Sequence, residues 1–164
     1  MVAESDFLCL LEAARWAPSS RNDQPWFFLY AVRGSRHWPV FFDLLMDGNK
    51  VWCAKASTLM VLVSRETFEK DGSPSRTHSL DAGAAWQSLA LQASSMGLVC
   101  HGIGGFLVDR AKESLRIPDG FVPEMMIAVG LPGDVDDLPE DLRVREVPSG
   151  RRRVSEFAWA GAWR

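Results

Sequence analysis

The 164-residue sequence has only three cysteines, no basic-then-apolar leader, and no apolar run long enough to cross a bilayer. The cysteines, Cys9, Cys53 and Cys100, lie far apart, as expected for free thiols in a reducing compartment. An excess of basic residues is also missing, because the net charge is -3 and the isoelectric point is near 5.6. These absences predict a cytoplasmic protein without disulfides, a membrane span or a nucleic-acid surface.

The composition that remains is that of an ordinary globular protein, with 47% hydrophobic and 24% charged residues. The length suits one domain with its own core, and no internal repeat divides the chain, so we expect a single domain over residues 1–164. Seven tryptophans are many for this length. Core packing is their first explanation, and a flat-ligand site or a subunit interface is the second.

Hydrophobic periodicity predicts helices that alternate with buried strands. We expect helices over residues 5–16, 38–46, 79–96 and 110–115, and strands over residues 27–32, 58–64 and 125–129. The helix over 79–96 carries so little charge that it should be central and buried. The polar segment 65–78 contains Gly72 and Pro74 and predicts a mobile loop. This alternation indicates an α/β sandwich.

The segment between the first helix and the first strand is rich in hydroxyl and amide groups, and Pro18 and Pro25 fix its backbone at both ends. Such a frame can hold several hydrogen-bonding groups against a flat, heteroatom-rich ligand at a low ordering cost. An ordinary connecting loop is the alternative. The candidate ligand residues are Pro18, Ser19, Ser20, Asn22 and Gln24.

The glycine cluster Gly102-Ile103-Gly104-Gly105-Phe106 does not fit a dinucleotide-binding fingerprint, because the third glycine would fall at Leu107. Glycines nevertheless let a backbone approach a ligand closely. A plain turn is the other interpretation.

The run Arg151-Arg152-Arg153 has two interpretations. A run of charges is usually a solvated surface patch. On an extended backbone, however, Arg151 and Arg153 would face the same side, and guanidinium groups suit a phosphate.

Other reaction classes lack their residues. Cys100 and His101 are adjacent on a predicted extended segment and should point to opposite faces, which argues against a thiolate–imidazole pair. The three histidines have no metal-ligand spacing, and neither a nucleophile elbow nor a phosphate-binding Gly-Lys-Ser/Thr loop occurs. No side chain stands out as a general acid or base.

The segment Ala17–Trp26 carries the pattern Ala-Pro-Ser-x-x-Asn-x-Gln-Pro-Trp, and Asp81-Ala82-Gly83 and the 102–106 cluster follow in order. Together these motifs resemble the FMN-dependent nitroreductase family. The resemblance implies a three-layer sandwich with a central, mostly antiparallel sheet flanked by helices. It also implies a homodimer with exchanged C-terminal segments and an FMN site between the subunits.

The resemblance assigns roles to individual residues. The Gly104 N–H would donate to flavin N5, Gly105 would leave room for the ring, Asn49 in a turn would contact the pyrimidine ring, and Arg151 with Arg153 would bind the phosphate. The implied FMN-binding residues are Pro18, Ser19, Ser20, Asn22, Gln24, Asn49, Ile103, Gly104, Gly105, Arg151 and Arg153.

The chain departs from the family pattern in two places. Trp52 stands where some relatives have a lysine near flavin N1 and O2, and no basic segment precedes the first helix.

The function implied is an FMN-dependent NAD(P)H oxidoreductase that passes hydride through flavin N5 to an aromatic acceptor such as a nitroaromatic or a quinone. No side chain is expected to be catalytic, because the cofactor carries the chemistry. Two alternatives remain. The same fold and flavin could serve dehalogenation or ring oxidation, or the protein could be a flavin-free homodimer without enzymatic activity.

Overall fold

The computed structural model describes residues 1–163, which divide into two units, residues 1–132 and residues 133–163. The expectation of one domain over 1–164 stays a prediction. None of the helices within residues 1–163 combines the length and the apolar character needed to cross a membrane.

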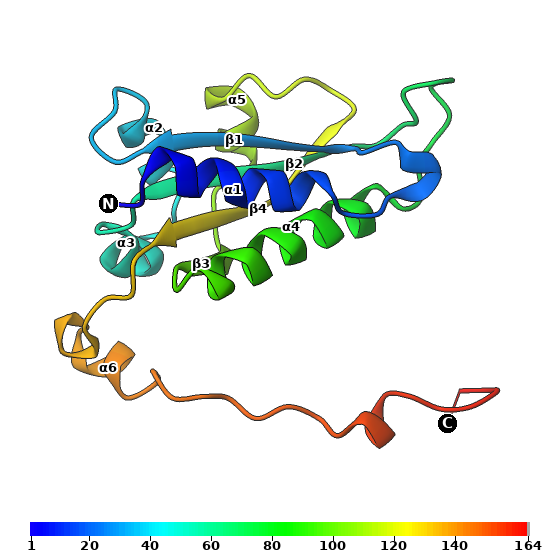
Figure 1. Ribbon diagram of the computed structural model, residues 1–164. Coiled ribbons are helices and arrows are strands. Elements are labelled where there is room, and N and C mark those ends of the chain that lie inside the picture. The colour runs from blue at the N-terminus through cyan, green and yellow to red at the C-terminus, as the bar shows by residue number, and fades with distance from the viewer. Residues whose placement is uncertain (164) are drawn as a thin grey trace. The chain divides into compact units, whose positions relative to one another are not determined.

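A four-stranded antiparallel sheet forms the centre of the first unit (Figure 1). Its strands are β1 (Trp26–Val32), β2 (Thr58–Arg65), β3 (Val99–Ile103) and β4 (Phe121–Gly130), in the spatial order β1-β2-β4-β3. The inner strand β2 is buried along nearly its whole length, which explains its continuous apolar run. β1 and β3 are the edge strands.

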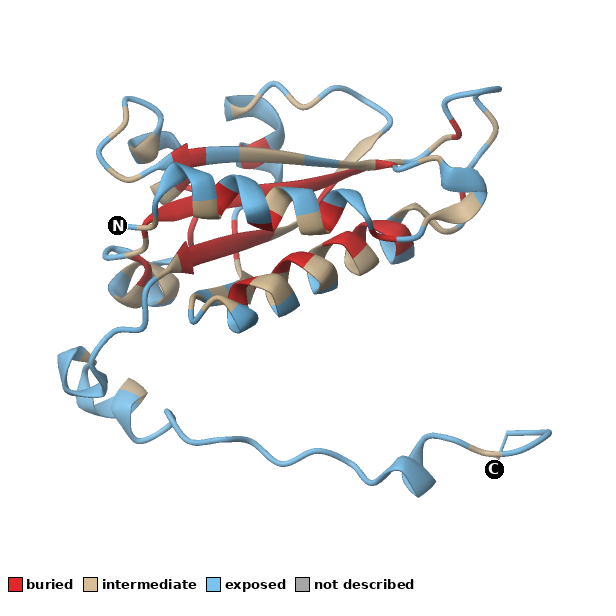
Figure 2. Ribbon diagram, viewed as in Figure 1, coloured by how far each residue is buried: buried red, intermediate tan, exposed pale blue. Residues whose placement is uncertain are grey.

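Helices cover both faces of the sheet. α1 (Glu4–Arg15) and α4 (His78–Ser95) pack on one face around Leu10, Leu89 and Ile127. The short helices α2 (Trp38–Phe42), α3 (Asp47–Cys53) and α5 (Val108–Ser114) contribute to the core on the other face. Burial is therefore concentrated on the inner strands and on the helix sides that meet them (Figure 2). The three-layer, antiparallel sandwich predicted above is confirmed.

The uncharged helix α4 follows its prediction closely. Its inward residues Ala82, Ala85, Leu89 and Ala93 are fully buried, because small side chains let the helix lie close to the sheet. Gly97 (φ 70°) ends the helix in a left-handed conformation, where the Leu98 N–H donates to the Ala93 carbonyl at 2.9 Å.

Three helices and strands differ from expectation in their type or bounds. α2 ends at Phe42, although the apolar spacing continues to Met46. Asn49, expected in a turn, lies instead in the first turn of α3, which begins at Asp47. β4 begins at Phe121 rather than Met125, because Pro123 is accommodated where the pairing with β2 shifts register between Leu62 and Val63.

The segment 65–78, expected to be a mobile loop, is held by contacts between its own residues. Thr67 pairs with Pro74 in an isolated antiparallel bridge, and the Phe68 N–H donates to the Ser73 carbonyl at 2.8 Å. The Phe68 side chain is buried. Polar composition predicted the absence of a regular element but not the contacts that hold the segment in place.

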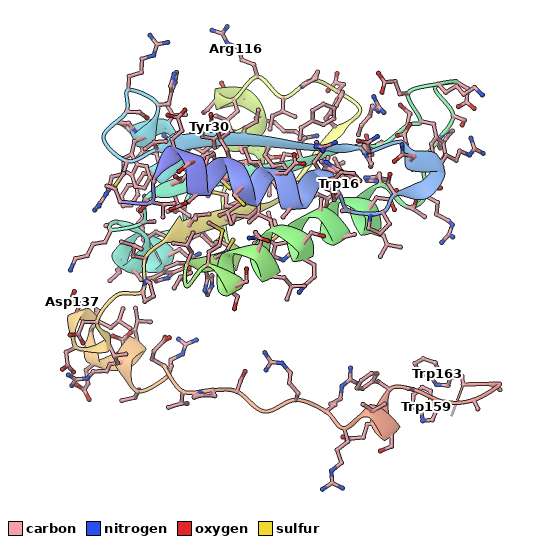
Figure 3. The ribbon with its side chains drawn as sticks, in the orientation of Figure 1. Trp16, Tyr30, Arg116, Asp137, Trp159 and Trp163 are labelled. Atoms are coloured by element: carbon pink, nitrogen blue, oxygen red, sulfur yellow. The ribbon has the colours of Figure 1, made fainter. Side chains whose placement is uncertain are left out.

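The second unit contains α6 (Glu140–Arg143) and two single turns of 3-10 helix, Val135–Asp137 and Val154–Glu156. None of residues 133–163 is buried. The rings of Trp159 and Trp163 contact each other near its end, with centroids 5.0 Å apart (Figure 3).

Candidate functional site

The loop between α1 and β1 holds five of the predicted ligand residues, namely Pro18, Ser19, Ser20, Asn22 and Gln24. Its anchor is Asp81, a buried carboxylate in the first turn of α4. Oδ2 of Asp81 accepts hydrogen bonds from the Ser20 N–H at 3.0 Å and from the Thr77 hydroxyl at 3.2 Å. Sequence reasoning placed Asp81 in the central helix but missed this role, for which the only signal was an acidic residue at the start of an uncharged helix.

This loop has an unusual backbone. Arg21, Asn22 and Gln24 adopt left-handed conformations with φ of 56°, 54° and 49°. The Gln24 N–H donates to the Ser19 hydroxyl at 3.0 Å, and the Gln24 side-chain amide donates to the Asn22 carbonyl at 3.1 Å. Hydrogen bonds within the loop therefore add to the Asp81 anchor in ordering its polar groups, as a preorganised ligand site requires.

A shallow hollow of about 650 Å³ lies between this loop and the start of α4. Its residues combine an apolar surface with a few hydroxyl and carboxylate groups, the mixture typical of small-molecule sites. They are Pro18, Ser19, Ser79, Leu80, Asp81, Gly83 and Ala84.

The second group of predicted residues lies where β3 ends. The Asn49 side-chain amide, on α3, donates to the Gly105 carbonyl at 2.8 Å. A Cβ at Gly105 would stand 3.1 Å from that amide nitrogen, whereas a Cβ at Gly104 would meet nothing within 4 Å. The backbone at Gly104 is thus open on the side where a side chain would stand, and a flat ligand could approach it.

Gly102, in the same cluster, has a packing role instead. A Cβ there would lie 2.3 Å from the Met125 Cε and 3.1 Å from the Trp86 ring. The cluster therefore divides into a packing glycine (Gly102), an open glycine (Gly104) and a glycine that fits closely against Asn49 (Gly105).

The two residues adjacent on β3 face opposite sides, as predicted. The His101 ring contacts Trp52 of α3, with centroids 4.6 Å apart. Cys100 packs with the core on the α4 side, and burial raises the pKa of its thiol to about 12. A thiolate–imidazole nucleophile is therefore not formed here.

Lys50, two residues before Trp52 on α3, forms an ion pair with Asp47 at 3.0 Å. No group of three or more His, Cys, Asp or Glu residues within 1–163 could hold a metal ion.

A polar network that sequence reasoning did not find joins β2, β4 and α4. The fully buried Ser64 hydroxyl lies 2.8 Å from His78 Nδ1 and 2.5 Å from Glu124 Oε1. The same Glu124 oxygen accepts a hydrogen bond from the Ser79 hydroxyl at 2.7 Å. Ser79 also lines the hollow described above.

The predicted residues of the first unit thus form two groups. No hydrogen bond, ion pair or ring contact in residues 1–163 joins the loop at 18–24 to the group of Asn49, Ile103, Gly104 and Gly105. Their strands, β1 and β3, are three strand spacings apart, or about 14 Å. Arg151 and Arg153 belong to the second unit, where the Arg151 guanidinium donates to the Ser149 hydroxyl at 2.6 Å.

None of the seven tryptophans is buried, so core packing does not explain them alone. Four lie partly buried at the margin of the two core clusters: Trp26, Trp38, Trp52 and Trp86. Trp16, at the end of α1, is 74% exposed (Figure 3).

Comparison with known proteins gives consistent matches. Residues 37–131 match the model of the nitroreductase family. A crystal structure of an oxidoreductase containing FMN superposes with a TM-score of 0.95 at 46% identity, over 99% of this chain and 84% of that chain.

Two proteins match by sequence. An uncharacterised 15.4 kDa protein of Mycolicibacterium smegmatis is 34% identical over 73% of this chain and 80% of its own length. A protein of Archaeoglobus fulgidus, provisionally named an NADH dehydrogenase/NAD(P)H nitroreductase, is 26% identical over 85% of this chain and 79% of its own length.

Proposed function

Because the chain belongs to the nitroreductase family of flavin oxidoreductases, we propose that it binds FMN and uses NAD(P)H to reduce electron-poor aromatic acceptors such as nitroaromatics or quinones. The observation that carries the cofactor assignment is the 46% identity, at a TM-score of 0.95, to an oxidoreductase containing FMN. Use of NAD(P)H is supported by the provisional name of the Archaeoglobus fulgidus relative.

The described residues fit a flavin. The open backbone at Gly104 leaves space for the edge of a planar ring, and the Asn49 amide is fixed beside it by its bond to the Gly105 carbonyl. The Ile103 side chain is buried in the core, so only its backbone, at the end of β3, would lie against the same ligand. When bound, FMN would supply the hydride chemistry. The protein's part would be to bind, orient and exclude water, and we assign no side chain a proton-transfer role.

A complete site needs groups that one copy does not bring together. We propose that the loop at 18–24 serves the FMN held at Gly104 and Asn49 of a second copy, in a homodimer. Several observations favour this arrangement. The second unit buries no residue, and it exposes Val154, Phe157 and Trp163 by 68%, 53% and 88%. Apolar surface of this kind indicates a protein interface.

Exchange of C-terminal segments would cover this surface. The edge strand β1 pairs only with β2 and exposes Phe27 and Tyr30 by 43% and 47%. An unpaired, apolar strand edge is a site where a further chain can add. In the exchanged dimer, Arg151 and Arg153 would reach the FMN phosphate, for which paired guanidinium forks are suited.

The first experiment is the visible spectrum of the purified protein, before and after added FMN. Flavin bands that stay with the protein through gel filtration support the proposal, and a colourless protein that does not take up FMN would overturn it. Turnover with NADH and NADPH against a nitroaromatic and a quinone then tests the reaction. A flavoprotein inactive with all four pairs would indicate dehalogenation or ring oxidation instead.

The phosphate contact has its own test. Arg153→Ala should weaken FMN binding by about tenfold to a hundredfold, since a hydrogen bond to a charged group contributes roughly 1.5–3 kcal/mol. Arg152→Ala is the matched control, because neighbouring side chains on an extended backbone point to opposite sides. Equal FMN affinities for the two variants in a fluorescence titration would remove Arg153 from the site.

A further inference from the structure

The loop that contains Ser20, Asn22 and Gln24 is strained. Four non-glycine residues within 1–163 have a positive φ, and three of them, Arg21, Asn22 and Gln24, lie here. Left-handed backbone is unfavourable for residues with a Cβ, and it persists only where surrounding contacts hold it. The contacts that hold this loop therefore determine whether it keeps the conformation in which it would bind a ligand.

The central contact is made by Asp23, which lies between the strained residues. Asp23 Oδ2 accepts a hydrogen bond from Arg65 Nη2 at 3.0 Å, and Oδ1 accepts one from the backbone N–H of Glu69 at 3.0 Å. The Asp23 and Arg65 side chains are only 8% and 14% exposed. Both carboxylate oxygens are thus occupied, and hydrogen bonds between charged groups that are mostly buried are strong.

A second contact reinforces the first. The Arg21 guanidinium lies over the Phe68 ring, 4.3 Å from its centroid, and it pairs with Asp71 at 3.5 Å. Phe68 is itself buried in the segment 65–75.

The segment 65–75 is held by hydrogen bonds of its own. The Ser75 N–H donates to the Glu66 carbonyl at 2.8 Å, and Arg65 Nε donates to the Thr67 carbonyl at 3.0 Å. The Arg65 guanidinium that contacts Asp23 is therefore also held by the Thr67 carbonyl of its own segment.

We propose that Asp23 and Arg65 are positioning residues, which clamp the 19–24 loop in the conformation that presents Ser20, Asn22 and Gln24 to FMN. Neither residue is assigned a contact with the cofactor. This inference rests on the proposed function and deepens it, because it says what keeps that part of the site preformed. If the clamp is released, the loop relaxes toward right-handed conformations. The apparent affinity for FMN then falls in proportion to the fraction of molecules that keep the competent loop.

The test compares Asp23→Asn with Glu69→Gln. Asp23→Asn removes the nearly buried charge that Arg65 faces, whereas the Glu69 carboxylate, which pairs with Arg65 at 3.3 Å, is 76% exposed, and exposed ion pairs contribute little. FMN is titrated into each apoprotein and followed by quenching of flavin fluorescence. We expect the Kd to rise by about tenfold or more for Asp23→Asn. For Glu69→Gln we expect it to stay within about twofold of wild type.

A control separates positioning from a general loss of stability. Gly97→Ala strains the end of α4, outside this loop, and should lower the melting temperature without changing the Kd for FMN. Arg65→Lys keeps the charge but loses the planar fork, so its Kd should lie between those of wild type and Asp23→Asn. If Asp23→Asn does not fold, Arg65→Lys replaces it in every comparison.

Hydrogen exchange on the proteins without FMN gives the second readout. The amides of residues 19–24 should exchange at least about tenfold faster in Asp23→Asn than in Gly97→Ala at matched stability. Unchanged exchange there would overturn the clamp, and so would an FMN Kd within twofold of wild type. If wild type itself binds no FMN, the proposed function fails, while the exchange measurement still decides whether Asp23 and Arg65 hold the loop.

Discussion

The side-chain amide of Asn49 donates a hydrogen bond to the carbonyl oxygen of Gly105 at 2.8 Å, which joins the first turn of α3 to the chain just beyond β3. The two residues are 56 positions apart in the sequence. Their contact fixes the backbone next to Gly104, whose open side is the proposed approach of the flavin ring. A side chain at Gly104 would therefore block the proposed approach of the ring, whereas one at Gly105 would crowd the Asn49 amide.

Alanine at these two glycines should separate binding from stability. At Gly104 a methyl group meets no atom within 4 Å, so we expect a change in unfolding free energy within about 0.5 kcal/mol. The methyl would occupy the ring's approach, and FMN affinity should fall by about tenfold or more. At Gly105 the added Cβ lies 3.1 Å from the Asn49 amide nitrogen, and the strained hydrogen bond should cost about 1 kcal/mol.

Urea unfolding of the apoproteins and FMN titration measure the two effects. A Gly104→Ala variant that binds FMN like wild type would contradict the placement of the ring at this backbone.

The ends of α4 and α5 allow a paired prediction of opposite sign. Arg116 follows α5 with φ 54°, its N–H donates to the Glu113 carbonyl at 3.2 Å, and its exposed side chain points away from the fold (Figure 3). Arg116→Gly removes the left-handed strain and should raise the unfolding free energy by about 0.5–1 kcal/mol. Gly97→Ala introduces the same strain after α4 and should lower it by about 1 kcal/mol. Urea titrations at one pH measure the unfolding free energy of both variants. If the two variants change it in the same direction, the prediction is wrong.

The sequence predicted the sheet and α4 well because their signals are local. A continuous apolar run reports burial on both faces of β2, and small uncharged residues report the close packing of α4. The first half of β4 was missed because Pro123 argues against a strand, and only the pairing with β2 shows the register shift that accommodates it. α3 was missed because Asp47 and Gly48, typical of turns, here begin a helix.

The candidate site also has a part that the sequence predicts and a part that it does not. The motif residues of the 18–25 loop could be selected directly, since their types and spacing are distinctive. Its supporting contacts could not, because Asp81 lies 61 residues from Ser20 and Arg65 lies 42 residues from Asp23. Contacts over such separations depend on the tertiary fold, and no periodicity in a single sequence encodes them.

The buried Ser64 hydroxyl should contribute measurably to stability. A hydroxyl carries one hydrogen, and when that hydrogen goes to the Glu124 carboxylate, His78 Nδ1 must donate to the Ser64 oxygen. Ser64→Ala leaves both partners short of a hydrogen bond and should lower the unfolding free energy by about 1–3 kcal/mol. Ser79→Ala, which removes an exposed hydroxyl bound to the same carboxylate, should cost less than about 1 kcal/mol. If the two variants lose the same unfolding free energy in urea, the burial of Ser64 does not strengthen its contribution to stability.

The three thiols should differ in reactivity. Cys9 is exposed on α1, whereas burial raises the pKa of both Cys53 and Cys100 to about 12. Because the thiolate is the reactive form, one thiol should react rapidly with Ellman's reagent in the native protein and three in denaturant. Cys9→Ser should abolish the rapid phase, and a rapid phase that survives would place reactivity at a buried thiol.

The same two pKa values predict how stability changes with pH. In the unfolded chain the thiols ionise near their ordinary value of 9.0, while in the native protein they keep their protons until about 12. Above pH 9 the unfolded state therefore binds fewer protons, so the unfolding free energy falls as pH rises, by at most about 1.4 kcal/mol per pH unit for each thiol. Urea unfolding between pH 7 and about pH 10.5 should show a shallower decline for Cys100→Ala than for wild type. Parallel curves would mean that the Cys100 thiol titrates alike in both states, because groups common to the two proteins cancel in the comparison.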